Sequence, residues 1–174
     1  MTKATEAMKE AENYNVKGVK SFEGHDGIGI NANFYYGKKK IAHVHDGAYG
    51  GELEVHYFDQ EASKKFDVFL KDYPEQPDTY EDSGFSKFDQ EDFINRLVNR
   101  DLLGKELKNK LKKKVLYINK KGEIRQINFK KVKAIIRGHI DAAHKHYGNE
   151  FMNGTKCLNE LPFKQALAVY ERNT

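Results

Sequence analysis

The segment Ile28–Tyr36, with the sequence IGINANFYY, gives the clearest indication of the fold. Every second residue from Ile28 to Phe34 is apolar, and the residues between them are glycine or asparagine. This period of two is typical of a β-strand with one buried face and one exposed face. The segment therefore predicts a strand at the centre of the N-terminal half.

Three further strands are predicted around this segment, at Val16–Phe22, Ile41–His45 and Glu52–Phe58. Short glycine-containing turns separate them, and strands joined by such short connections must pair antiparallel. The N-terminal half is therefore expected to form an antiparallel β-meander.

Helical spacing of apolar residues replaces the strand pattern after Asp59. A later hairpin is expected where Val115–Asn119 and Glu123–Phe129 flank the turn Lys120–Gly122. The expected helices are Thr2–Tyr14, Asp59–Tyr73, Asp89–Gly104 with a basic continuation to Lys113, Val132–Gly148 and Pro162–Glu171, and Glu75–Lys87 is expected to be a loop.

This order of elements predicts an α+β fold, in which an N-terminal antiparallel meander and a later hairpin pack with three to five helices. We expect one α+β domain over residues 1–174, with sub-units at 15–73 (meander plus helix) and 89–174 (helices plus hairpin).

The composition excludes several classes of protein. The chain has 174 residues and a single cysteine, Cys157, so an internal disulfide is impossible. A reducing compartment is consistent with that, and we expect Cys157 to be a free thiol in a late loop. No apolar run approaches the roughly 20 residues of a membrane span, which predicts a cytoplasmic protein without a membrane partner. No complete catalytic or cofactor motif is present, so we expect no cofactor and favour a protein that is not an enzyme.

The charge is distributed unevenly. Residues 1–101 carry 13 Lys and Arg against 20 Asp and Glu, a net charge of −7, whereas residues 102–174 carry 17 against 6, a net charge of +11. Such asymmetry suggests a polyanionic or acidic partner. Residues 41–92 hold most of the acidic excess, which could repel nucleic acid, imitate it or engage a basic partner, or simply be a solvated face.

The basic excess lies mainly in residues 105–145, with 14 Lys and Arg against 3 Asp and Glu. Phosphate backbones are attracted to such surfaces, although a solvated, solubilising surface is the alternative. Lys130, Lys133 and Arg137 are expected at helical spacing opposite the apolar stripe. The candidate residues for nucleic-acid or partner binding are Lys112, Lys113, Lys114, Arg125, Lys130, Lys133 and Arg137.

Two turns of the expected meander should lie side by side, because alternate connections fall at the same end of the sheet. These are the turns Gly24–Gly27 and Asp46–Gly51. They place His25, Asp26 and Tyr49 in one loop cluster, a candidate ligand site. A metal set of His43, His45 and Asp46 adjoins it, since imidazole and carboxylate ligate metals or act as acid and base. The alternative is turn chemistry alone, which also requires glycine and aspartate.

A second group of polar residues lies on the late helix: His139, Asp141, His144 and His146. Histidines near a helix C-terminus complement the partial negative charge there. We expect this role for them in preference to catalysis.

Several motifs resemble small uncharacterised proteins of bacteriophages and mobile elements over about half of the chain. They are Phe22–Gly27, Asn31-Ala32, Tyr36–Lys39, Asp46–Glu52, and the Val115–Phe129 hairpin with a following helix that ends at Tyr147-Gly148. The resemblance implies an accessory protein in the host cytoplasm. Its expected function is to bind and inhibit or modulate a host protein or nucleoprotein complex, such as a CRISPR defence complex.

Two alternatives remain open. One is a nucleic-acid-binding module that uses residues 105–145 to bind DNA or RNA. The other is a metal-dependent hydrolase built on the His/Asp loop cluster.

Overall fold

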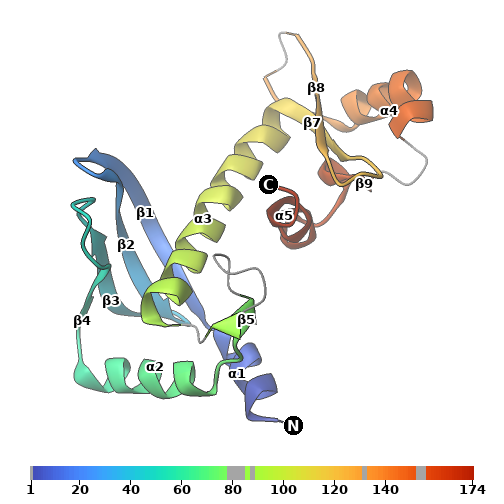
Figure 1. Ribbon diagram of the computed structural model, residues 1–174. Coiled ribbons are helices and arrows are strands. Elements are labelled where there is room, and N and C mark those ends of the chain that lie inside the picture. The colour runs from blue at the N-terminus through green and yellow to red at the C-terminus, as the bar shows by residue number, and fades with distance from the viewer. Residues whose placement is uncertain (1, 78–84, 87–88, 131–132, 152–155) are drawn as a thin grey trace. The chain divides into compact units, whose positions relative to one another are not determined.

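The computed structural model describes residues 2–77, 85–86, 89–130, 133–151 and 156–174. The chain divides into two compact units, residues 1–101 (unit 1) and 102–174 (unit 2). Figure 1 colours unit 1 from blue to green and unit 2 from yellow to red. Helix α3 (Gln90–Lys113) contributes residues to both units.

Unit 1 contains the predicted antiparallel meander, in the order β1-β2-β3-β4. Ile30, Ala32 and Phe34 of β2 are buried on one face as the alternation predicts, whereas Ile28 is 70% exposed. Ala32 and Phe34 pair with Val44 and Ala42 on β3. The elements of unit 1 are α1 (Lys3–Ala11), β1 (Tyr14–Gly24), β2 (Gly27–Tyr36), β3 (Lys39–Asp46), β4 (Glu54–Tyr57), α2 (Gln60–Asp72), β5 (Gln76–Pro77), β6 (Phe85–Ser86) and the first part of α3.

An aromatic core holds unit 1 together. Phe34 on the sheet and Phe66 on α2 are both excluded from water, and their ring centroids lie 5.1 Å apart. Tyr14 packs against Phe69 at 4.7 Å, and Phe93 of α3 packs against Phe66 at 5.5 Å. Offset and edge-to-face aromatic pairs such as these stabilise a core beyond their buried area.

Unit 2 contains the predicted hairpin within a three-stranded antiparallel sheet of order β8-β7-β9. The hairpin turns at Gly122, whose φ of 81° is left-handed and suits glycine. The elements of unit 2 are the end of α3, β7 (Lys114–Ile118), β8 (Ile124–Asn128), α4 (Arg137–Phe151), β9 (Lys156–Cys157), the 3₁₀ helix η1 (Leu158–Glu160) and α5 (Phe163–Glu171). The α+β class is thus confirmed.

Helices cover both faces of the unit 2 sheet. On one face, Leu116 and Ile118 of β7 pack with Leu107 of α3 and Tyr170 of α5. On the other face, Val115 and Tyr117 belong to a cluster with Ile140 and Ala143 of α4. Strand β7 is therefore the buried centre of the unit.

Several predicted helix boundaries are wrong. Gly104 does not end α3, which runs through the expected basic continuation to Lys113, because Leu107 and Leu111 continue the apolar stripe within unit 2. Helix α1 ends at Ala11, since Tyr14 already belongs to β1.

Helix α4 also differs from its expected range. It begins at Arg137 instead of Val132 and continues past Gly148 to Phe151. Lys130 and Lys133 therefore precede the helix and do not share helical spacing with Arg137.

The expected loop Glu75–Lys87 contains a two-residue antiparallel pairing, β5 with β6, and residues 78–84 and 87 lie outside the described residues. β9 and η1 were not expected from the pattern. In the parts of the chain that the structure describes, no helix is both long enough and apolar enough to cross a membrane.

The aromatic core makes a testable prediction for unit 1. Replacement of the fully buried Phe34 by alanine should lower the free energy of unfolding by about 3–5 kcal/mol, because it removes a ring and leaves a cavity. Tyr35→Ala, on the opposite face of β2, should cost clearly less, because Tyr35 is half-buried. Urea unfolding followed by near-ultraviolet circular dichroism measures both; equal losses would contradict the assigned faces.

Candidate functional site

Five lysines gather at one end of the unit 2 sheet, from the end of α3, the start of β7 and the segment after β8. The hairpin register pairs Lys114 with Asn128. The Ile135 amide donates to the Lys112 carbonyl over 2.7 Å, which holds the segment after β8 against the end of α3. We call this group the lysine end: Lys112, Lys113, Lys114, Lys130 and Lys133.

Four acidic side chains of unit 2 pair with other basic residues. Glu106 binds Lys110, and Glu123 binds Arg125 at 2.6 Å. Arg137 contacts both Asp141 and Glu160, at 2.9 and 2.6 Å. Arg125 and Arg137 are thus partly neutralised.

The lysines of the lysine end differ from Arg125 and Arg137 in their ion pairing. Within the described ranges, Lys112, Lys113, Lys130 and Lys133 form no ion pair, and Lys114 Nζ donates to the neutral Gln126 side chain at 2.7 Å. Of the seven predicted binding residues, the five lysines therefore carry uncompensated charge at one place.

Asn159 fixes the junction from which the lysine end projects. Its Oδ1 accepts a hydrogen bond from the Leu116 amide at 2.8 Å. Its Nδ2 donates to the carbonyls of Leu111 and Lys114, at 3.1 and 3.0 Å. One side chain thus satisfies backbone groups on both sides of the change from helix α3 to strand β7.

The predicted loop cluster in unit 1 has its two turns side by side. The Asp26 amide donates to the Ala48 carbonyl at 2.8 Å, and Asp26 Oδ2 lies 3.6 Å from the position that a Cβ on Gly50 would occupy. Asp46 Oδ1 accepts from the Ala48 amide at 2.8 Å, which is ordinary turn chemistry. Tyr49 is 75% exposed and His25 is also exposed.

The predicted metal residues of β3 do not converge. His43 and His45 lie on the face opposite the core, whereas Asp46 has the strand parity of Val44 and bonds within its own turn. His45 Nδ1 lies 3.0 Å from Asn31 Oδ1, and its ring stacks on Phe22. His56 on β4 pairs directly with His43.

A groove of about 750 Å³ lies in unit 1 beside α1, α2 and the β2–β3 turn. Its lining includes the apolar residues Ala7, Tyr14 and Phe69. Charges of both signs border it, and Lys39 pairs with Asp59 at 3.2 Å. The groove therefore does not select a ligand by charge.

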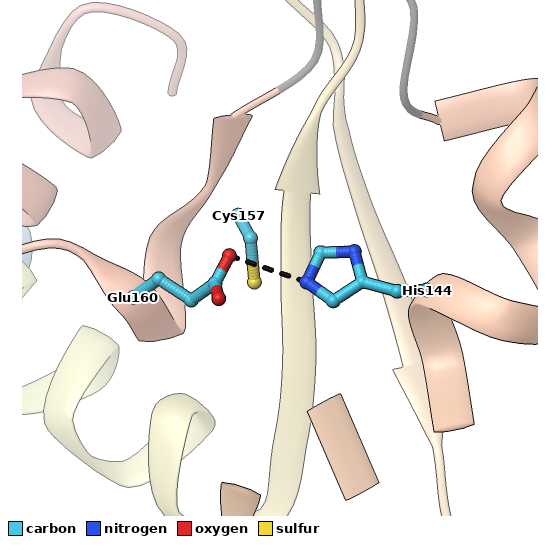
Figure 2. Close-up of side chains that lie close together, drawn as sticks. All are labelled: His144, Cys157 and Glu160. Carbon is cyan, nitrogen blue, oxygen red and sulfur yellow. Dashed lines mark hydrogen bonds and ion pairs between the residues drawn. The ribbon is translucent and has the colours of Figure 1, made fainter. Parts of the chain in front are cut away.

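A cluster of metal-ligating groups occurs in unit 2. The donor atoms of His144, Cys157 and Glu160 all lie within 4.8 Å of one another, the one such group of three among the described residues. His144 Nε2 lies 3.2 Å from Glu160 Oε2. Figure 2 shows the Cys157 sulfur beside this pair, with α4 supplying the imidazole and β9 and η1 supplying the other two side chains.

The environment of Cys157 favours its neutral thiol. Burial raises the pKa of the thiol, and the Glu160 carboxylate adds to the rise. The amides of Asn159 and Glu160 and the Tyr117 hydroxyl oppose it, because they interact favourably with the thiolate. An activated thiolate nucleophile would require the opposite balance.

Two expectations from the sequence, one for Cys157 and one for His144 on the late helix, are wrong in part. Cys157 is a free thiol, but it is buried in β9 instead of lying in a loop. His144 lies two turns before the end of α4 and pairs with Glu160, so it does not complement the helix terminus. The overlooked signal was Cys157-x-x-Glu160, a spacing at which one turn can direct two ligands to the same ion.

Comparison of the chain with models of protein families, with curated proteins and with solved structures gave no match. The likeness to phage and mobile-element proteins therefore stays a prediction.

The junction at Asn159 predicts a stability effect. Asn159→Ala should lower the free energy of unfolding by about 1–3 kcal/mol, because it leaves the Leu116 amide and two carbonyls without this partner. Asn128→Ala, an exposed change on β8, should stay within about 0.5 kcal/mol. Equal denaturation midpoints for both variants would contradict the structural role of Asn159.

The environment of Cys157 predicts the pH dependence of its alkylation. In the native protein, the pH at half-maximal iodoacetamide rate should lie above that of the urea-unfolded chain, because burial disfavours the thiolate. The measured quantity is the pH at half-maximal rate, because limited access of iodoacetamide to a buried thiol would lower the rate at every pH without shifting that midpoint. A native profile displaced to lower pH would contradict this environment.

Proposed function

We propose that this chain binds nucleic acid through the lysine end of unit 2. The proposal depends on one arrangement of charge. Five lysines from three segments lie at one end of the sheet, while acidic side chains of the same unit pair with other lysine and arginine residues. Uncompensated like charges in proximity repel each other. A bound polyanion would relieve that repulsion.

Complementing the helix dipole explains only part of this arrangement. Lys112 and Lys113 lie in the last turn of α3, where positive charge is favourable. Lys130 and Lys133 come from the segment after β8, which the dipole of α3 does not require to be basic. Their presence at the same place supports a binding surface.

The chemistry of lysine indicates how the nucleic acid would be recognised. Lysine ammonium groups contact phosphates as point charges and carry no base information. The neighbouring Phe129 ring packs against His139, with centroids 5.0 Å apart, so it is engaged within the protein. We therefore expect backbone recognition with little preference for sequence.

The net charge of +11 on residues 102–174 supports the same function, since a basic unit attracts nucleic acid over a distance. The wider hypothesis, an accessory phage protein that acts on a host nucleoprotein complex, is compatible with this activity and stays a prediction.

The test is binding of labelled single- and double-stranded DNA and RNA across a salt series. The wild-type protein should show an affinity that falls steeply with salt. The variant Lys112→Glu/Lys130→Glu/Lys133→Glu should lose most of this affinity. Its salt slope should be smaller by about one for each phosphate group that the variant no longer binds.

The matched control is Lys120→Glu/Lys121→Glu/Lys156→Glu. It changes the charge of the same unit equally, but at the opposite end of the sheet, where Lys156 pairs with Ile118 and the hairpin turns. This control should retain most of the binding. Equal losses in both variants would show that only net charge matters, and absence of wild-type binding at physiological salt would overturn the proposal.

A further inference from the structure

We propose that His144, Cys157 and Glu160 form a binding site for a divalent transition metal, with zinc the ion that fits best. Sulfur, imidazole nitrogen and carboxylate oxygen are the ligands that zinc takes in proteins. The three side chains come from α4, β9 and η1, so the fold brings them together from separate elements. The inference does not depend on nucleic-acid binding.

The separations between the donor atoms are close to those of a small coordination sphere. His144 Nε2 and Glu160 Oε2 lie 3.2 Å apart, and the sulfur lies within 4.8 Å of both. Ligands around tetrahedral zinc, with bonds of about 2.0–2.3 Å, lie about 3.3–3.8 Å from one another. Figure 2 shows the three side chains close together, and small adjustments of them would bring their donor atoms to these separations.

A second set of residues orients the ligands. Arg137 Nη1 holds Glu160 Oε1 at 2.6 Å, which leaves Oε2 directed at His144. The Tyr117 ring meets the imidazole edge-on, with centroids 5.8 Å apart. Metal sites commonly hold their carboxylates through outer partners such as Arg137.

The surroundings of Cys157 also suit a metal thiolate. Two amides and the Tyr117 hydroxyl interact favourably with the charged sulfur, whereas burial raises the pKa of the thiol. A divalent cation supplies the missing positive charge, so its binding displaces the thiol proton into solvent and forms the metal–sulfur bond.

Three protein ligands leave one position for water on a four-coordinate ion. The site has access to solvent, since the side chains of His144 and Glu160 are 21% and 32% exposed. A bound ion would also link α4 to the β9–η1 segment, so it should stabilise unit 2.

The experiment uses reduced, metal-free full-length protein titrated with Co²⁺ and then with Zn²⁺. Cobalt should bind one to one and give a sulfur-to-cobalt charge-transfer band together with visible bands of tetrahedral cobalt. Zinc should displace cobalt, release protons and raise the thermal midpoint. His144→Gln and Glu160→Gln should each weaken binding at least tenfold, and Cys157→Ser should abolish the charge-transfer band.

His146→Gln is the matched control, because His146 is exposed on the same helix. It should bind cobalt like the wild type. Far-ultraviolet circular dichroism of each metal-free variant shows whether it folds. If Cys157→Ser does not fold, the cobalt affinities of His144→Gln and Glu160→Gln test the site instead. Folded wild-type protein without a thiolate–cobalt band, or equal weakening by His146→Gln and His144→Gln, would overturn the proposal.

Discussion

The side chains of Val115–Ile118 are excluded from water on both faces of the unit 2 sheet. Leu116 and Ile118 face α3 and α5, and Val115 and Tyr117 face α4. Burial of such a strand requires helices on both sides, which explains why three separate helices meet at β7. Both candidate sites depend on this strand: the lysine end surrounds its first residue, and the metal ligands adjoin its last two, where β9 pairs.

The sheet of unit 1, in contrast to that of unit 2, buries only one of its faces. This face packs against α2 and α3 through aromatic rings, and the other face carries polar side chains such as Asn31, His43 and His56. That arrangement produces the alternation seen at Ile28–Tyr36. The acidic excess of residues 1–101 is separated from the basic excess along the same boundary that divides the two compact units.

The meander and the hairpin could be predicted because each strand shows its pattern locally. The extent of α3 could not be read from Gly104, since a glycine ends a helix only where the apolar stripe also stops, and Leu107 continues the stripe. The lysine count was visible in the sequence. The ion pair of Arg137 with Glu160 was not, because Glu160 follows 23 residues later.

The metal ligands were hidden for a related reason. His144 lies on a helix, whereas Cys157 belongs to a two-residue strand whose position depends on pairing with β7. A strand of two residues is too short to show a periodic pattern in the sequence. Only the register of Tyr117 with Cys157 places the sulfur beneath α4.

Strand β8 is an edge strand of its sheet. The unpaired backbone N–H and C=O groups of an edge strand can form hydrogen bonds with a strand of another chain. Here β8 bears the exposed Arg125 and Gln126 and runs into the lysine end. If two copies of the chain approached edge to edge at β8, the positive charge of the lysine end would oppose their pairing. A bound polyanion would screen that repulsion, so occupancy by nucleic acid and self-association of the protein would favour each other.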